Sequence, residues 1–287
     1  MLLNLKEMLQ TAADQHFAVG AFNCSELSLV RAVVEEAEAA QAPAIIQAAV
    51  GEFNFATEYF YTYVVKRLEA SSVPFVLHLD HGKTFDDCVR AVRAGFTSVM
   101  IDGSEAAFEE NAALTSKVVE MAHAVGVSVE GEIGTIGKMS TSDEGGVDHI
   151  TYTNPEDVVR FIEATGADAL AIAIGTAHGI YPQGFVPHLQ LDLLREIAEI
   201  TPVPLVLHGG SDNPDDEIRQ ACQIGIAKVN ISSDIKKVFF DEVQRVITET
   251  GAFMPPKVFN AAIGKTRTCV RTKMELFNSV GKAKFYK

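Results

Sequence analysis

Eight short apolar runs, rich in β-branched residues, recur along this 287-residue chain. Each run is nearly continuously apolar, which is typical of a parallel strand buried on both faces of a sheet. The stretches between the runs have the apolar period of an amphipathic helix. Eight β-then-α units predict an α/β fold, a closed (β/α)8 TIM barrel. The runs occupy residues 16–23, 43–49, 74–80, 97–102, 127–132, 168–174, 203–208 and 226–230.

The chain is expected to form one domain. A TIM barrel often takes about 250 residues, no linker-like stretch interrupts the sequence, and 47% apolar residues are enough for one large core. We therefore assign residues 1–287 to a single barrel domain, with about 255–287 as a C-terminal helical extension. The alternative, a doubly wound open sheet, uses fewer strands and usually has a Gly-rich phosphate loop after its first strand, which this chain lacks.

Helix start signals fit the same pattern. Ser25 precedes the first amphipathic stretch, and Asn154-Pro155 and Asn213-Pro214 precede two later ones. Ser and Asn are favoured caps at the start of a helix, and Pro is tolerated in its first turn. We expect helices to begin at these three places.

Charge and composition exclude several classes of partner. The formal net charge of −14 argues against a nucleic acid or a membrane surface as partner, since both need clustered Lys and Arg. Lys6, Glu7 and Asp14 interrupt the first residues, so we expect neither a signal peptide nor a membrane span, and a cytoplasmic location. The four cysteines are widely separated and predict neither disulfides nor a thiolate metal site.

Three histidines, His81, His178 and His208, follow three different predicted strands. In a barrel these strand ends meet at one rim, where active sites lie. Three imidazoles that leave one coordination position open are the ligand set of catalytic zinc. We predict a zinc site there, whereas His78, within a strand, is expected to be a hydrogen-bonded core residue.

Carboxylates also end these strands. Asp80 precedes His81, close enough to exchange a proton with a metal-bound substrate, or alternatively to orient a histidine ligand. Asp102 and Glu132 end neighbouring strands, where they could hold a second cation or brace the histidines.

Small residues and hydroxyls follow the last strands, where barrels often bind phosphate. Gly209-Gly210-Ser211, the stretch 175–179 and the stretch 230–233 resemble such a cradle. The polar, Gly-rich stretch 134–152 is expected to be a mobile lid that carries Asp143 and Glu144. Asn23 and Gln47, at the ends of the first two strands, are further candidates for substrate binding.

Ordered motifs over about residues 4–285 resemble those of class II, zinc-dependent ketose-bisphosphate aldolases, the group of the fructose- and tagatose-bisphosphate enzymes. The motifs are GAFN, PAIIQ, HLDHG, MIDGS, VEGEIG, AIAIGTAHGIY, PLVLHGGSD and KVNISSD. The resemblance implies reversible retro-aldol cleavage of a ketose phosphate or bisphosphate to dihydroxyacetone phosphate and an aldehyde such as glyceraldehyde 3-phosphate.

The resemblance also implies roles for single residues. It makes His81, His178 and His208 the zinc ligands, Asp102 and Glu132 the site of a second metal ion, and Asp80 the catalytic acid/base, with Glu144 moving a second proton. The dihydroxyacetone phosphate half would be bound by Gly179, Gly209, Gly210, Ser211, Asn230, Ile231, Ser232 and Ser233. A monovalent cation (Na⁺ or K⁺) beside the phosphate, and a homodimer or homotetramer, are implied as well.

Two departures concern the aldehyde half. Ser232 replaces an aspartate of the fructose-bisphosphate pattern, and Ala49 replaces a serine that helps to hold the second phosphate. The tagatose-type branch is closer at these positions, so the resemblance leaves the aldehyde open. A distal phosphate could be held by the basic residues of the C-terminal extension, which could equally form a solvated helix face; they are Lys265, Arg267, Arg271 and Lys273.

Two other reactions remain possible from the residues alone. A zinc hydrolase acting on a sugar phosphate would use the same histidines and aspartate to activate water. A Schiff-base aldolase would need a lysine on a barrel strand, and Lys228 is the candidate.

Overall fold

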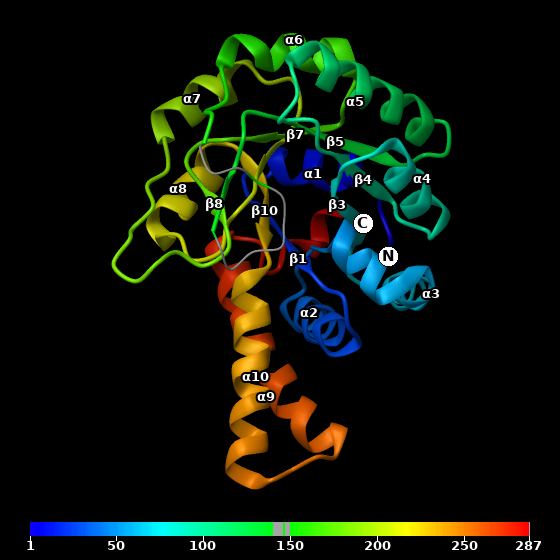
Figure 1. Cartoon of the computed structure of the whole chain (residues 1–287), viewed down its shortest axis with the longest axis vertical. Helices are drawn as coiled ribbons and strands as arrows, with labels where there is room; N and C mark the ends of the chain where they lie inside the picture. The colour runs from blue at the N-terminus through cyan, green and yellow to red at the C-terminus, as the bar shows by residue number, and fades with distance from the viewer. Residues whose placement is uncertain (140–145, 147–149, 287) are drawn as a thin grey trace.

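The computed structural model describes residues 1–139, 146 and 150–286. Within them, eight parallel strands close into a barrel in the order β1-β10-β9-β7-β5-β4-β3-β2, with helices between the strands (Figure 1). The predicted TIM barrel is confirmed, and every residue of these strands is buried. The strands are β1 Val19–Asn23, β2 Ala44–Ala49, β3 Phe75–Gly82, β4 Ser98–Ile101, β5 Ser128–Ile133, β7 Ala169–Ile172, β9 Leu205–Leu207 and β10 Ile226–Ile231.

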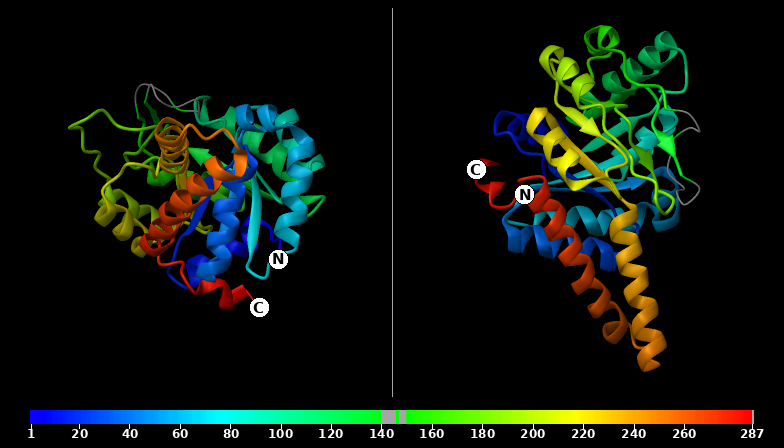
Figure 2. Two further views of the ribbon diagram at one scale, coloured as in Figure 1. Left: turned by 90° about the horizontal axis from the view of Figure 1, so that it is seen from below. Right: turned by 90° about the vertical axis from the view of Figure 1, so that its left-hand side faces the viewer.

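Eight helices among the described residues follow the barrel strands, and all of them except α9 lie around the barrel (Figures 1 and 2). One predicted start is correct, because the Asn154 side chain caps α6 by accepting a hydrogen bond from the Glu156 N–H. The first is wrong by one residue: Glu26, and not Ser25, caps α2. The helices are α2 Leu27–Ala40, α3 Val50–Glu69, α4 Phe85–Arg93, α5 Phe108–His123, α6 Pro155–Thr165, α7 Leu191–Ile200, α8 Asp215–Ile224 and α9 Ser233–Thr250.

The third predicted start has a different local structure. Helix α8 begins after Pro214, and the Asn213 side chain folds back to donate to the carbonyl oxygens of Gly209 (2.6 Å) and Ser211 (2.8 Å). Asn213 therefore shapes the loop after β9 instead of capping the helix.

A helix that was not among those predicted closes the amino-terminal end of the barrel. Helix α1 spans Leu5–Asp14, and its Leu5, Met8 and Leu9 are fully buried. They form an apolar cluster with strand side chains such as Val19 and Ile45. The spacing of Leu5, Met8 and Leu9 is helical and could have predicted this helix. With this end filled by apolar side chains, the polar residues of the barrel gather at the other end.

Two short strands, β6 Gly137–Lys138 and β8 Ala177–His178, form a separate pair beside the barrel. The Met139 N–H donates to the His178 carbonyl oxygen over 2.8 Å. This pairing fixes the backbone of the loop after β7 that carries His178.

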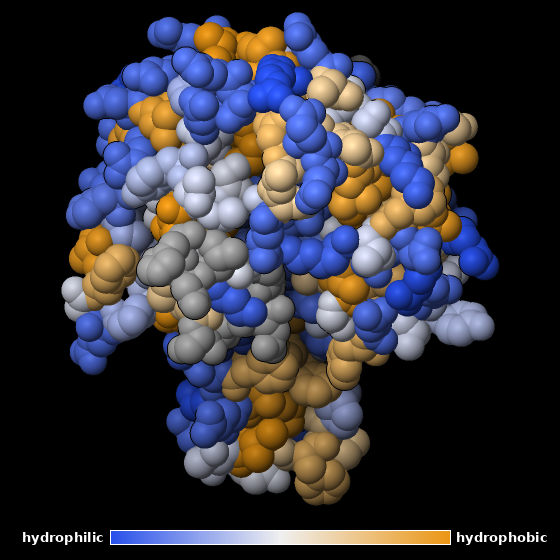
Figure 3. Space-filling view, turned by 45° about the horizontal axis from the view of Figure 1, so that its top comes forward, coloured by the Kyte–Doolittle hydropathy of each residue, from blue (hydrophilic) through white to orange (hydrophobic). Residues whose placement is uncertain are grey.

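The C-terminal region forms a helical arm. Helix α10, Pro255–Leu276, runs back along α9, and both project from the barrel before the chain ends in a short 3-10 helix, η1 Lys282–Tyr286 (Figures 1 and 2). Apolar side chains lie on the surface of the arm (Figure 3), and Phe253 at its turn is 87% exposed. None of the described helices has the length and apolar character needed to cross a membrane.

Candidate active site

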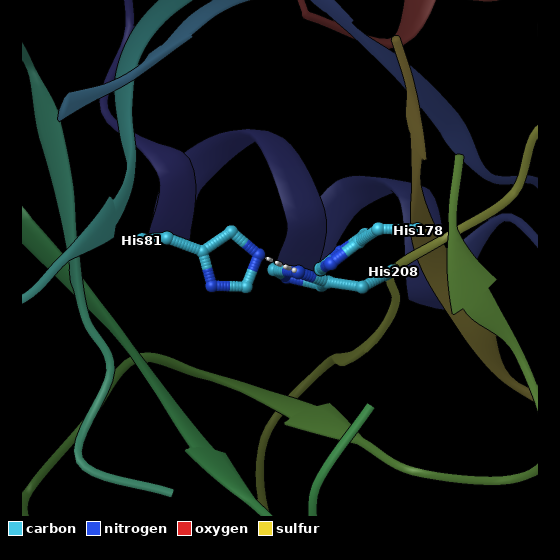
Figure 4. A group of neighbouring side chains, drawn as sticks. All are labelled: His81, His178 and His208. Carbon is cyan, nitrogen blue, oxygen red and sulfur yellow. Dashed lines mark hydrogen bonds between the residues drawn. The ribbon is translucent and has the colours of Figure 1, made fainter. Parts of the chain in front are cut away.

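The barrel brings three histidines together at its carboxyl-terminal end (Figure 4). His81 lies near the end of β3, His178 in β8 and His208 directly after β9, and all three are buried. One nitrogen from each ring lies within 4.8 Å of the other two. Nitrogens bound to one tetrahedral zinc ion at 2.0–2.1 Å are about 3.3 Å apart, so the spacing fits a shared metal ion.

The hydrogen bonds of two of these rings support a cation between them. His81 Nδ1 is 2.9 Å from Asp102 Oδ2, and His208 Nε2 is 2.8 Å from Glu130 Oε1. Since a carboxylate only accepts hydrogen bonds, each outer nitrogen carries the proton. The inner nitrogens, His81 Nε2 and His208 Nδ1, then face each other across 2.9 Å. Two lone pairs at this distance repel unless a proton or a metal ion lies between them.

The pKa shifts of the two rings are consistent with one shared positive charge. Burial lowers the pKa of His208 well below its usual value, and the neighbouring His81 and Lys228 act in the same direction. Burial also opposes a charge on His81, but Asp80 and Asp102 outweigh it and raise the pKa of His81 to about 10. The residues present therefore suit a bound cation.

Asp80 is held beside this cluster by three side-chain amides. Asn23 Nδ2 (3.0 Å) and Gln47 Nε2 (3.2 Å) donate to Oδ2, and Asn230 Nδ2 (3.0 Å) donates to Oδ1. Burial alone would raise the pKa of Asp80, but nearby positive charges, His81 first, and the hydrogen bond from Asn23 lower it to about 2. Asp80 is thus an ionised carboxylate in a fixed orientation, suited to accept a proton from a substrate hydroxyl.

Asp102 and Glu132 form a second group of potential metal ligands with His81. One carboxylate oxygen of each and one ring nitrogen of His81 lie within 4.8 Å of one another. Asp102 also accepts hydrogen bonds from Lys83 Nζ (2.6 Å) and Ser104 Oγ (2.7 Å). Burial would raise the pKa of Asp102, but His81 and Lys83 lower it. Burial and the charge of Asp102 raise the pKa of Glu132 well above its usual value. Asp102 is therefore placed to orient His81, and Glu132 is placed to complete a cation site or to remain protonated.

Below the histidines, the barrel encloses an ion pair that was not predicted from the sequence. Lys228 Nζ lies 2.9 Å from Glu130 Oε2, and both side chains are completely buried. His78 lies in the same interior layer, with Nδ1 2.9 Å from Ser98 Oγ, as expected for a core histidine. Glu130 thus binds both His208 and Lys228. Its position two residues before Glu132 puts both side chains on the same side of the strand, and this spacing could have predicted that Glu130 points into the barrel.

The loops that were predicted to bind phosphate pack closely. Gly209 has φ +61°, and a Cβ there would lie 2.6 Å from the Ala177 carbonyl oxygen, so only glycine fits. Ser232 directly precedes α9 without capping it, and its buried hydroxyl has no hydrogen-bond partner among the described residues. Backbone N–H groups at the start of α9 suit an anion. Ile231 differs, because its side chain lies in the hydrophobic core and only its backbone is available.

The remaining predicted positions lie near these loops or outside the described residues. Ser211 Oγ accepts a hydrogen bond from the Asp234 N–H over 3.4 Å, which joins the loop after β9 to the start of α9. Gly210 donates its N–H to the Asn230 carbonyl oxygen over 3.0 Å. Gly179 follows His178 with φ +105°. Asp143 and Glu144 lie outside the described residues.

Comparison with known proteins decides the family. The model of class-II fructose-bisphosphate aldolases matches residues 3–282. The chain belongs to this family. It is therefore an aldolase, an aldehyde-lyase, and the hydrolase alternative finds no support. The Schiff-base alternative does not fit the structure either, because Lys228 is buried against Glu130.

Named relatives agree on the class of enzyme and differ in substrate. The chain is 40% identical to the 6-phospho-5-dehydro-2-deoxy-D-gluconate aldolase of Halalkalibacterium halodurans, over 99% of this chain and 98% of the relative. It is 36% identical to the fructose-bisphosphate aldolase of Thermus caldophilus, over 99% and 100%. Among solved structures, the YdjI aldolase of Escherichia coli K12 superposes with a TM-score of 0.86 at 31% identity, covering 99% and 100%. The predicted closeness to the tagatose-type branch stays a prediction.

The Glu130–Lys228 pair generates a prediction about the stability of this aldolase. Lys228→Met should lower the free energy of unfolding by about 3–5 kcal/mol, because it leaves the buried Glu130 carboxylate without its counter-charge. The double variant Glu130→Gln with Lys228→Met should recover most of this loss. Urea denaturation measures both, with the exposed, ion-paired Lys237→Met as control. A single variant as stable as the unmodified protein would contradict the assignment of the pair.

Proposed function

We propose that this aldolase is zinc-dependent and reversibly cleaves a ketose phosphate or bisphosphate into dihydroxyacetone phosphate and an aldehyde. The observation that carries the proposal is the contact between His81 Nε2 and His208 Nδ1, whose outer nitrogens are both held by carboxylates. With His178 this gives three imidazole ligands and an open fourth position. Zinc bound there would act as a Lewis acid on the ketone and hydroxyl oxygens of the substrate.

The chain's own residues perform the proton transfer. Asp80, ionised and fixed by three amides, accepts the proton of the C4 hydroxyl during cleavage and returns it during condensation. Asn230 would stabilise the negative oxygen of the enediolate by a hydrogen bond. A second acid/base must move the proton at the carbon of the bound triose, and from the sequence we assign it to Glu144.

The phosphate of the triose would lie between the loops after β9 and β10 and the Gly179 backbone. Their backbone N–H groups and hydroxyls bind an anion without a net positive surface, which accounts for a phosphate ligand on a chain of net charge −14. A monovalent cation beside this phosphate, and a second divalent ion at Asp102 and Glu132, belong to the same proposal.

Assembly and location remain predictions from the sequence. The exposed apolar side chains of the arm support a homodimer or homotetramer, which the molar mass from light scattering would check. We keep the prediction of a cytoplasmic enzyme whose partner is a small sugar phosphate.

Removing one histidine ligand tests the metal. His208→Ala should lose bound zinc and aldolase activity together, because two imidazoles hold the ion far more weakly than three. Metal analysis after dialysis and a triose phosphate release assay measure the two properties. His188→Ala, whose ring is exposed and bound to Glu217 instead, is the control and should keep both. Full turnover by metal-stripped protein would contradict zinc dependence.

Removing the proposed base tests the mechanism separately from the metal. Asp80→Ala should keep its zinc and lose about 10²–10⁴-fold in the cleavage rate, the usual contribution of a positioned acid/base. Cleavage of fructose 1-phosphate and of fructose 1,6-bisphosphate, which release a plain and a phosphorylated aldehyde, measures the rate through triose phosphate formation. The control is Asp86→Ala, an acidic residue of the first turn of α4 outside the site. Cleavage at the unmodified rate would remove Asp80 from the mechanism.

A further inference from the structure

An ion pair spans the end of β1, at a place that the functional assignments do not cover. Glu52, in the first turn of α3, lies with Oε1 2.7 Å from Lys236 Nζ, in the first turn of α9. The two side chains are only 15% and 30% exposed. The other carboxylate oxygen of Glu52, Oε2, accepts hydrogen bonds from the Ala49 N–H (3.0 Å) and from Asn23 Nδ2 (3.1 Å).

This pair is one hydrogen bond away from the proposed base. The same Asn23 amide that donates to Glu52 also donates to Asp80 Oδ2 over 3.0 Å. The other oxygen of Asp80, Oδ1, faces Asn230 and lies 4.0 Å from His81 Nε2. Asp80 therefore stands between the metal ligands on one side and the Asn23–Glu52 contact on the other.

The position of the pair identifies the part of the substrate that it would meet. The phosphate cradle is built from loops after β7, β9 and β10, whereas Glu52 follows β2, on the far side of β1 in the barrel order. If Asp80 takes the proton of the C4 hydroxyl while the triose phosphate lies in the cradle, the carbons beyond C4 would lie on the side of Asp80 that faces Asn23 and Glu52, with Lys236 joining this side to the helix that starts at the cradle. These carbons form the aldehyde half.

A phosphate at the end of that half would meet unfavourable groups. Glu52 presents a negative charge, it occupies the Ala49 N–H that an anion would otherwise use, and it neutralises Lys236. Three of the four basic residues of α10 named above, which could replace Lys236, are engaged as well. Arg267 and Arg271 bind Glu36, and Lys273 binds Asp234 over 2.6 Å.

We propose that Glu52 and Lys236 determine the choice of aldehyde, and that they select one whose far end carries hydroxyl groups and no phosphate. This inference rests on the proposed function, because it requires that the site condense an aldehyde with dihydroxyacetone phosphate. Hydroxyl groups can donate to the carboxylate and accept from the ammonium, so the pair itself recognises such an aldehyde.

Two probes that differ only by phosphate test the proposal. The zinc-loaded enzyme condenses dihydroxyacetone phosphate with either D-glyceraldehyde or D-glyceraldehyde 3-phosphate, and kcat/KM is measured for each. We expect the unmodified enzyme to use the plain aldehyde at least as well as the phosphorylated one. Glu52→Gln should raise the ratio of phosphorylated to plain aldehyde by roughly tenfold, mainly through a lower KM, because it removes a partly screened like charge.

The partner variant should change the ratio in the opposite direction. Lys236→Gln leaves Glu52 uncompensated and should lower the ratio below that of the unmodified enzyme. A purely structural ion pair would instead lower both rates equally in both variants and leave the ratio constant. Glu58→Gln, an acidic residue of the same helix that lies against Arg90, is the matched control and should not move the ratio.

Three results would overturn the inference. They are a preference of the unmodified enzyme for the phosphorylated aldehyde by more than about tenfold, a ratio that stays constant in Glu52→Gln, and a ratio that moves the same way in both variants. If the unmodified enzyme condensed neither aldehyde nor any other, the proposed function itself would fail, which is a different observation from an unchanged ratio.

Discussion

The contact between His81 and His208 is the constraint on which the site depends. These residues are 127 positions apart in the chain, and only closure of the barrel brings their inner nitrogens to 2.9 Å. The contact would be repulsive without a cation, because carboxylates hold the proton of each ring on its outer nitrogen. The two carboxylates therefore orient the rings so that the lone pairs of both inner nitrogens face the same point.

Buried charge is the physical cost of this arrangement, and the structure compensates each charge locally. Asp102 is paired with Lys83, Glu130 with Lys228, and Asp80 receives three amide donors. The opposite end of the barrel needs no such compensation, because α1 fills it with apolar side chains. Stability and chemistry are thus separated along the barrel axis, as is general for this fold.

The sequence predicts the barrel and the rim because both depend on local patterns. Apolar runs located all eight strands, and the polar residue ending each run located His81, His208 and Asp80.

Side-chain pairs are harder to predict. Lys228 lies in an apolar strand and suggested a Schiff base, whereas its actual partner, Glu130, is on another strand. The Glu52–Lys236 contact depends on two long side chains from helices that are separate in the chain. Cap preferences favour Ser25 over Glu26, although the longer Glu26 carboxylate accepts hydrogen bonds from the N–H groups of Ser28 and Leu29.

Net charge gave little information about the ligand, and the structure explains why. At the start of α9, the Ser232 hydroxyl has no hydrogen-bond partner among the described residues, and the first-turn backbone N–H groups suit an anion, so no cationic side chain is required there. Near the start of α3, the equivalent donors are already used, since the Glu52 carboxylate takes the Ala49 N–H and the ammonium of Lys236. Two helix starts at one rim thus differ in the donors that they leave for an anion, because the Glu52 side chain already binds those near the second. The net charge is a sum over the whole chain, so it does not show this difference between the two helix starts. The difference comes from the position of one carboxylate, that of Glu52.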